Sequence, residues 1–283
     1  MSAPFAFAPF RNAFAENKTR LVSLDLLPTE LLLTLGVAPI AIANGPLYAR
    51  LVAEPILPKS VNDLGPLNEP NAEFLQALAP DAILASEWQV SGLAPLKRIA
   101  PLIPLATIAP SVSAVDNNID LMNQLADLTE TQGEASLWIR RVETELSAAR
   151  GAVKARAKRP VYICRFSENG RNVALFGGNG MVGDVVKRLG LSNAWQGRVN
   201  ASGVTSAGID QLAENPDAII VHFDRGRETV QAMRKLAASS IWNALPAVRA
   251  GRVVAMPVIY PSGGVYSSIR FARQLVESLP ADG

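Results

Sequence analysis

Short apolar runs alternate with helical patterns along most of this 283-residue chain. In the first part of the chain, the apolar runs are residues 21–24, 40–43, 82–85 and 102–106. In the last part, they are residues 161–164, 173–176, 218–221 and 253–256. Buried strands separated by helices are typical of mostly parallel sheets that are covered by helices. The pattern therefore predicts an α/β protein with two Rossmann-like lobes.

Between these two parts lies a long helical pattern without proline, residues 131–158. Apolar side chains recur on one face of it at helical spacing: Trp138, Val142, Leu146, Ala149 and Val153. A helix of that length is about 40 Å long at 1.5 Å per residue. We therefore predict an N-terminal lobe over residues 1–130, a connecting helix over 131–158 and a C-terminal lobe over 159–283. A cleft between two lobes is a place to hold a small ligand.

The chain carries one histidine and one cysteine, His222 and Cys164. This excludes an intrachain disulfide, a histidine–cysteine zinc cluster and a pair of redox cysteines. We expect His222 to be a strand-end residue satisfied by hydrogen bonds, and Cys164 to be buried and inert. The net charge of +2 does not indicate nucleic acid as a partner. No apolar run reaches the roughly 18–20 residues that a membrane span requires.

Two segments allow more than one interpretation. Residues 1–17 contain four phenylalanines but lack the uninterrupted apolar stretch of a secretory signal. They are either what remains of a removed leader or an arm that packs on the first lobe. Residues 177–180, Gly-Gly-Asn-Gly before a helical pattern, are either a phosphate cradle or a tight turn. Their spacing matches neither the P-loop nor the dinucleotide fingerprint, which favours the turn.

Polar and aromatic side chains follow the predicted strands at their carboxyl ends, where ligands bind to open parallel sheets. These candidates are Trp88, Gln89, Arg165, Arg225, Arg227, Tyr260 and Ser262. The planar guanidinium of arginine binds a carboxylate through two hydrogen bonds, and Trp88 and Tyr260 can stack on a ligand. In the alternative interpretation, Arg225 and Arg227 belong to a solvated surface loop with Asp224 and Glu228.

An ordered series of short motifs resembles one known family, the periplasmic ferric-hydroxamate siderophore-binding proteins. The motifs are LLPTELL (26–32), NDLG (62–65), EPN (69–71), LAPD (78–81), IAP (99–101), NAWQG (193–197), IWNALP (241–246) and VRAGR (248–252). They extend over nearly all of the chain from residue 20 to the C-terminus. No single motif is specific, and the resemblance rests on their order.

This resemblance implies two lobes with mostly parallel sheets, joined by a single long helix. Members of the family are the substrate-binding components of iron-uptake ABC transporters. The resemblance therefore implies a monomer in the periplasm that captures a ferric siderophore and delivers it to an inner-membrane permease. Because the iron arrives already chelated, we expect no cofactor, no protein ligand to the metal and no enzymatic activity.

The resemblance also maps the family's ligand contacts onto this sequence. The arginine and the tyrosine that contact the hydroxamate oxygens fall at Leu67 and Gln89. Other aromatic contacts fall at Ser202, Tyr260 and Ser262, while a tryptophan and an asparagine are kept at Trp195 and Asn200. Packing and pocket lining are both open for Trp195, and Tyr48 completes the predicted site. These changes leave two ligand classes open, a hydroxamate siderophore and an anionic citrate or carboxylate siderophore that would meet the arginines.

Glu73 and Asp210 stand near the starts of two helical patterns, one in each lobe. In the family, an acidic residue on each lobe engages arginines of the permease, so we predict that these two residues dock there. Acids in a first helical turn are also favourable by themselves, through the helix dipole. Three other functions remain open: a binding protein of the same superfamily for a cobamide or haem, an enzyme that uses the cleft, and an interaction scaffold without a small ligand.

Overall fold

The computed structural model describes residues 19–154 and 159–280. The predicted leader remnant or arm, residues 1–17, lies outside the described residues, as do the last four residues of the predicted connecting helix. None of the helices in the described part of the chain is both long and apolar enough to cross a membrane.

The first lobe is built on a five-stranded parallel sheet with strand order β3-β2-β1-β4-β5. Its strands are β1 (Leu21–Ser23), β2 (Ala41–Ile42), β3 (Asn62–Asp63), β4 (Ala82–Ser86) and β5 (Leu102–Leu105). Its helices are α1 (Leu26–Thr34), α2 (Gly45–Leu51) and α3 (Ala72–Ala77), with the 3-10 helices η1 (Glu87–Gln89) and η2 (Ala94–Arg98). Strand β4 is buried along its whole length, as its apolar sequence predicts. The predicted parallel sheet is confirmed.

The second lobe is built on a five-stranded mixed sheet with strand order β10-β9-β6-β7-β8, in which β7 runs antiparallel to both neighbours. Its strands are β6 (Val161–Phe166), β7 (Asn172–Phe176), β8 (Val204–Gly208), β9 (Ile219–Asp224) and β10 (Val253–Pro257). Its helical segments are α6 (Met181–Arg188), η3 (Ile209–Ala213), α7 (Arg227–Ala237), α8 (Ser240–Ala244), α9 (Pro246–Arg249) and α10 (Val265–Ser278). Because β6 continues to Phe166, Arg165 lies within the strand rather than after it.

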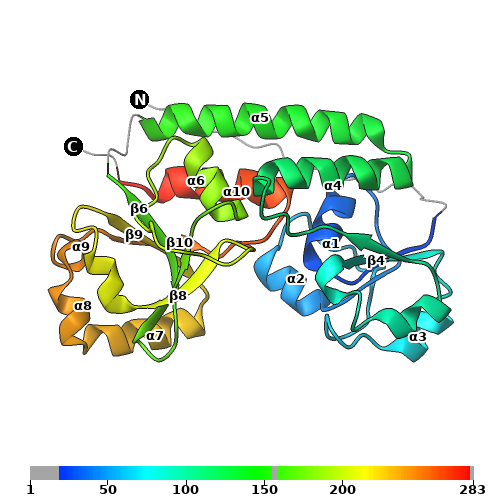
Figure 1. Cartoon of the computed structure of the whole chain (residues 1–283), viewed down its shortest axis with the longest axis horizontal. Helices are drawn as coiled ribbons and strands as arrows, with labels where there is room; N and C mark the ends of the chain where they lie inside the picture. The colour runs from blue at the N-terminus through cyan, green and yellow to red at the C-terminus, as the bar shows by residue number, and fades with distance from the viewer. Residues whose placement is uncertain (1–18, 155–158, 281–283) are drawn as a thin grey trace.

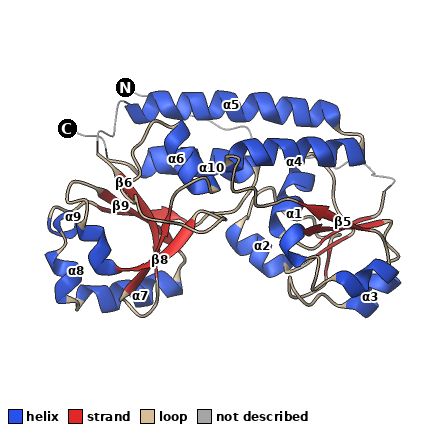
Figure 2. Cartoon of the chain, viewed as in Figure 1, coloured by secondary structure: helices blue, strands red, loops and turns tan. Residues whose placement is uncertain are grey.

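A layer of helices connects the two lobes. Helix α4 (Ala114–Thr129) is followed by the 23-residue helix α5 (Gln132–Lys154), which runs along both lobes (Figure 1). Helices α4, α6 and α10 pack beneath α5 (Figure 2). The predicted apolar face of α5 is buried, and the Trp138 ring lies 5.5 Å from the ring of Tyr266 in α10. The helical layer therefore joins the lobes through packing as well as through the chain.

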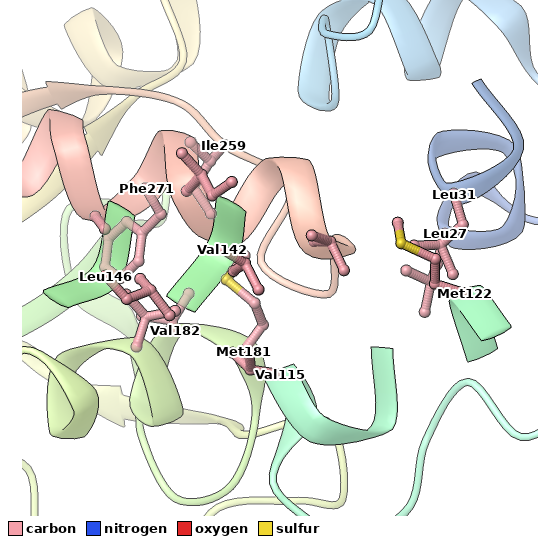
Figure 3. Close-up of a cluster of buried hydrophobic side chains, with 14 of the residues drawn as sticks. Leu27, Leu31, Val115, Met122, Val142, Leu146, Met181, Val182, Ile259 and Phe271 are labelled. Carbon is pink, nitrogen blue, oxygen red and sulfur yellow. The ribbon is translucent and has the colours of Figure 1, made fainter. Parts of the chain in front are cut away.

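One hydrophobic cluster extends through this layer from one lobe to the other. Figure 3 shows Leu31 and Met122 on the side of the first lobe, and Val142, Met181 and Phe271 toward the second. All five side chains are buried. Burial of apolar surface stabilises a folded protein by roughly 25 cal/mol per Å². Separating the lobes would expose the apolar surface of this cluster and would lose that stabilisation.

Polar contacts add to this joint where α10 begins. The buried carboxylate of Glu30, in α1, accepts hydrogen bonds from the backbone amides of Gly264 (3.0 Å) and Ser267 (2.8 Å) and from the Ser267 hydroxyl (2.6 Å). Further along α10, the Arg270 guanidinium donates to the carbonyl oxygens of Leu51 and Val52. Helix α10 is part of the second lobe in sequence, and these hydrogen bonds join it to the first lobe.

Candidate functional site

A depression between the two lobes is lined by loops next to strands of both sheets and by the start of α4. The first lobe contributes Thr107 and neighbouring residues after β5, and the second contributes Asn179, Ser202 and Ser262. The depression encloses about 380 Å³, including the part open to solvent. Two residues of the predicted site, Ser202 and Ser262, line this depression.

Hydrogen bonds between the lobes hold the wall of this depression in place. The Asn118 side chain donates to the carbonyl of Gly263 at 2.9 Å. The backbone amide of Ala114 donates to the carbonyl of Asn179 at 3.0 Å. Since each bond joins a residue of α4 to a loop of the second lobe, this end of the cleft is fixed in width.

The glycine-rich segment 177–180 forms part of the same wall as a tight turn. The amide of Gly177 donates to the carbonyl of Gly203 at 2.9 Å. Gly203 has a φ of +77°, and a Cβ atom on it would lie 2.6 Å from the Cα of Gly180. Two loops thus approach each other more closely than a side chain at Gly203 would permit. The backbone geometry agrees with the turn interpretation of this segment.

Three arginines lie close enough to interact, and we call them the arginine group: Arg50, Arg165 and Arg225. Arg50 lies in the last turn of α2, Arg165 in β6, and Arg225 directly after β9. Desolvation lowers the pKa of the Arg225 guanidinium, and repulsion from Arg165 and Arg50 lowers it further. The sequence predicted ligand contacts for Arg165 and Arg225 but not for Arg50. Arg50 lies in the other lobe and belongs to none of the motifs.

Two of the three arginines in this group share one acidic partner. Glu228, in the first turn of α7, pairs with Arg225 and also with Arg50, whose Nη1 atom lies 3.0 Å from Glu228 Oε1. Arg165 is exposed and forms no ion pair within the described part of the chain, and desolvation lowers its pKa. Arg165 is therefore the member of the group that is available to an added anion.

Arg227 does not join the arginine group. It is the first residue of α7, is exposed, and makes no ion pair with any residue that the structure describes. The predicted solvated loop thus fits Arg227, whereas Arg225 and Glu228 form a defined ion pair. A ligand contact of Arg227 stays a prediction.

Gln89 has a structural position rather than an accessible one. Its side chain is buried and donates to the carbonyls of Leu24 (3.0 Å) and Leu67 (3.1 Å), while its Oε1 accepts from the Ser86 amide at 3.0 Å. All three bonds hold the ends of β1 and β4 to the following loops. Its polar atoms are already used in these bonds, and a ligand contact of Gln89 stays a prediction. The partly buried Leu67 packs beside it on the sheet.

Tyr48 and Asn200 also make structural hydrogen bonds, although Asn200 is exposed, and a ligand contact of either stays a prediction. Tyr48 is 0% exposed, and its hydroxyl donates to the carbonyl of Pro55 at 2.9 Å. The side-chain oxygen of Asn200 accepts from the amides of Ser202 (3.1 Å) and Val204 (3.0 Å) and from the Ser202 hydroxyl (2.9 Å). These bonds close the turn before β8. Tyr48 thus supports the core, and Asn200 shapes the loop that presents Ser202.

The predicted aromatic contacts differ in how far they are exposed. Trp88, in η1, is 53% exposed and offers a free ring face. Tyr260 is partly buried against a cluster that includes Tyr48, and burial raises the pKa of its hydroxyl. Trp195 is also partly buried and packs on the second-lobe core. Stacking on a ligand remains a prediction for all three, and Trp88 has the accessible surface for it.

His222 and Cys164 are neighbours in register on adjacent strands. Both are buried, and desolvation lowers the pKa of the imidazole and raises that of the thiol. The prediction of a hydrogen-bonded His222 is wrong for its Nδ1 atom, which has no partner among the described residues and packs near the Phe166 ring. No group of three or more histidine, cysteine or acidic side chains in the described residues could hold a metal ion.

The two predicted docking residues are accessible. Glu73 is exposed in the first turn of α3, and Asp210 is exposed in the first turn of η3. Helix η3 packs against α8, and both α3 and α8 lie on the side of the molecule opposite α5 (Figure 1). One acid on each lobe therefore lies on elements away from the connecting helix. Their contact with a permease stays a prediction.

The sequence matches the model of the periplasmic binding protein family over residues 21–260. This chain belongs to that family. It is 32% identical to the iron(3+)-hydroxamate-binding protein FhuD of Escherichia coli, over 93% of this chain and 88% of that protein. It is 23% identical to the Fe(3+)-citrate-binding protein YfmC of Bacillus subtilis, over 83% of this chain and 71% of that protein.

A solved structure supports the same relationship. The siderophore-binding protein FhuD from Vibrio cholerae, with Fe³⁺–Desferal bound, matches with a TM-score of 0.85 and 29% identity. The match covers 92% of this chain and 97% of that chain. The resemblance drawn from the ordered motifs is thereby confirmed, and so is the fold class that it implies.

Proposed function

We propose that this protein is the extracytoplasmic substrate-binding component of an iron-uptake ABC transporter and that it captures a ferric siderophore in the periplasm. The observation that carries the proposal is the match, over nearly the whole of both chains, to a siderophore-binding protein with Fe³⁺–Desferal bound. Identity of 32% to a hydroxamate-binding protein supports the same ligand class. The iron is cargo that arrives chelated, so the protein itself neither coordinates it nor catalyses a reaction.

Within this class, the arginine group favours an anionic chelate. The position of the family's hydroxamate-contacting arginine is Leu67 here, and the position of its tyrosine partner is Gln89, which is buried and fully bonded. Positive charge is supplied instead by Arg165, Arg225 and Arg50. A guanidinium binds carboxylate through charge-assisted bonds. These observations support a siderophore with citrate-type carboxylates, bound between the arginine group and the depression lined by Ser202 and Ser262.

Delivery requires a membrane partner. We propose that the monomer docks its two lobes on the permease through Glu73 and Asp210, whose exposed carboxylates can pair with arginines.

Tryptophan fluorescence quenching by ferric citrate and by Fe³⁺–Desferal tests the proposal. We expect wild-type protein to bind at least one chelate, and Arg165→Ala to weaken the binding of ferric citrate. Loss of one hydrogen bond to a charged group costs about 1.5–3 kcal/mol, which is roughly a tenfold or larger rise in Kd. Arg234→Ala, an exposed arginine in the last turn of α7, is the matched control and should bind as wild type does.

Absence of binding to any ferric chelate would contradict the proposed function. Unchanged affinity of Arg165→Ala for ferric citrate would contradict only the assignment of an anionic ligand to the arginine group.

A further inference from the structure

Glu228 occupies an unusual position for a carboxylate in a site that favours anions. Its Oε1 atom faces Arg50 Nη1 at 3.0 Å, and its Oε2 atom pairs with Arg225 Nη2. Arg50 belongs to α2 of the first lobe, whereas Glu228 and Arg225 belong to the second. One side chain therefore bridges two arginines of different lobes, as a carboxylate group of a ligand would.

The local backbone holds Glu228 in this place. Gly226, with a φ of +67°, turns the chain between β9 and α7, and its amide donates to Asp224 Oδ1 at 2.9 Å. The amide of Arg225 donates to the Thr229 hydroxyl at 2.8 Å. These two bonds shape the turn beside which the side chains of Arg225 and Glu228 meet. The bridge is thus part of the folded loop.

We propose that Glu228 determines the charge specificity of the ligand site by competing with ligand carboxylates for Arg50 and Arg225. The inference rests on the proposed function and deepens it. A ligand with a single carboxylate can use Arg165 without displacing Glu228. A ligand with several carboxylates gains the other two arginines only by replacing the Glu228 carboxylate. The bridge therefore lowers the affinity of the site for polyanionic chelates more than for ligands with a single carboxylate.

The competition has a second consequence for cationic ligands. While Glu228 is ionised, it offsets part of the positive charge of the arginine group, and it reduces the repulsion that a positively charged chelate meets. Removal of its charge should therefore change the affinities for anions and for cations in opposite directions. A residue that merely oriented the arginines would lower anion affinity when removed.

Glu228→Gln tests this proposal because glutamine keeps the shape of the side chain and removes its charge. The probes are iron-free citrate, ferric citrate and Fe³⁺–Desferal, whose free amine is cationic at neutral pH. Isothermal titration calorimetry at low ionic strength should show citrate and ferric citrate binding about 2–5-fold more tightly to the variant than to wild type, since an exposed or half-exposed ion pair is worth up to about 1 kcal/mol. Fe³⁺–Desferal should bind more weakly to the variant than to wild type. The matched control is Glu143→Gln, which removes the same charge from the exposed face of α5 and should leave all three affinities unchanged.

The outcomes separate this inference from the proposed function. Weaker or unchanged citrate binding by folded Glu228→Gln would overturn the inference, even if wild-type protein binds a ferric chelate. Tighter citrate binding by the variant would support it, even if wild-type protein binds no ferric chelate and the siderophore function fails. An equal gain for citrate and for Fe³⁺–Desferal would also overturn it, because a general opening of the cleft has no charge preference.

Discussion

Glu30 carries a carboxyl group that is 0% exposed and lies where helix α10 begins. Burial raises its pKa, while bonds from the Ser267 hydroxyl and from the amides of Gly264 and Ser267 favour the carboxylate. These donors belong to the first turn of α10 and the residue before it, where amide groups lack intrahelical partners. At the residue scale, one side chain thus completes the N-terminus of a helix whose N-cap residue, Gly264, lies 234 positions later.

This burial predicts a pH-dependent stability that Glu30→Gln should remove. A carboxyl whose pKa is higher in the folded state binds more protons when folded, so its contribution is full below the unfolded value, near 4.5, and is lost as the pH rises through the folded pKa. We expect the Tm of wild type minus that of Glu30→Gln to fall as the pH rises above about 4.5. Thermal denaturation of both proteins from pH 4 to pH 8 measures this difference in Tm. A difference that grows with pH would contradict the direction of the shift.

Helix α5 contributes one apolar face to the hydrophobic cluster that both lobes share. Its buried positions Trp138, Val142 and Leu146 recur at helical spacing, and they pack against α10 and α6. Its opposite face is solvent-exposed and carries two glycines, Gly133 and Gly151. The helix was predictable because both its length and its apolar face are local properties of the sequence.

Gly151→Ala should stabilise this helix. Nothing lies within 4 Å of a Cβ atom at Gly151, and alanine is favoured over glycine in a helix by about 0.5–1 kcal/mol. Urea denaturation should show an increased free energy of unfolding of that size. Gly203→Ala is the contrasting variant: its φ of +77° and the contact with Gly180 predict a loss of stability. A destabilised Gly151→Ala would contradict the view of α5 as a regular helix with an open outer face.

The whole molecule is held together by contacts that cross between the lobes. The shared hydrophobic cluster, the bonds of Glu30 and Arg270, and the Asn118–Gly263 bond all join elements of different lobes. Opening or closing the cleft would break several of them at once. Rigid-body lobe motion is therefore restricted, and ligand binding should rely on a largely preformed site.

Small-angle X-ray scattering with and without ferric citrate tests this restriction. We expect the radius of gyration to change by less than about 1 Å, the scale of backbone shift in pre-organised complexes. Wild-type protein at pH 7 is the sample, and saturation is established beforehand by fluorescence quenching. A larger decrease on addition of the chelate would show that the lobes close by a hinge motion despite their shared core.

The sequence by itself determined the two α/β lobes, the long helix and the family. Eight apolar runs each correspond to a strand, because a buried strand needs consecutive apolar residues. The two strands that were missed, β3 and β8, lie at sheet edges; β3 consists of Asn62 and Asp63, and β8 is partly exposed and rich in small residues. Neither strand has an apolar run, whereas the other two edge strands, β5 and β10, have one and were predicted.

The tertiary structure alone decided which candidate residues share one site. Arg165 and Arg225 were predictable from their places near strand ends, but Arg50 and its bond to Glu228 join residues 178 positions apart. Likewise, Gln89 follows a strand like any ligand residue, and only the folded backbone shows that carbonyl groups already use its amide. Local patterns record which elements form. The pairing of polar groups between elements depends on how the lobes pack, and no local pattern encodes that.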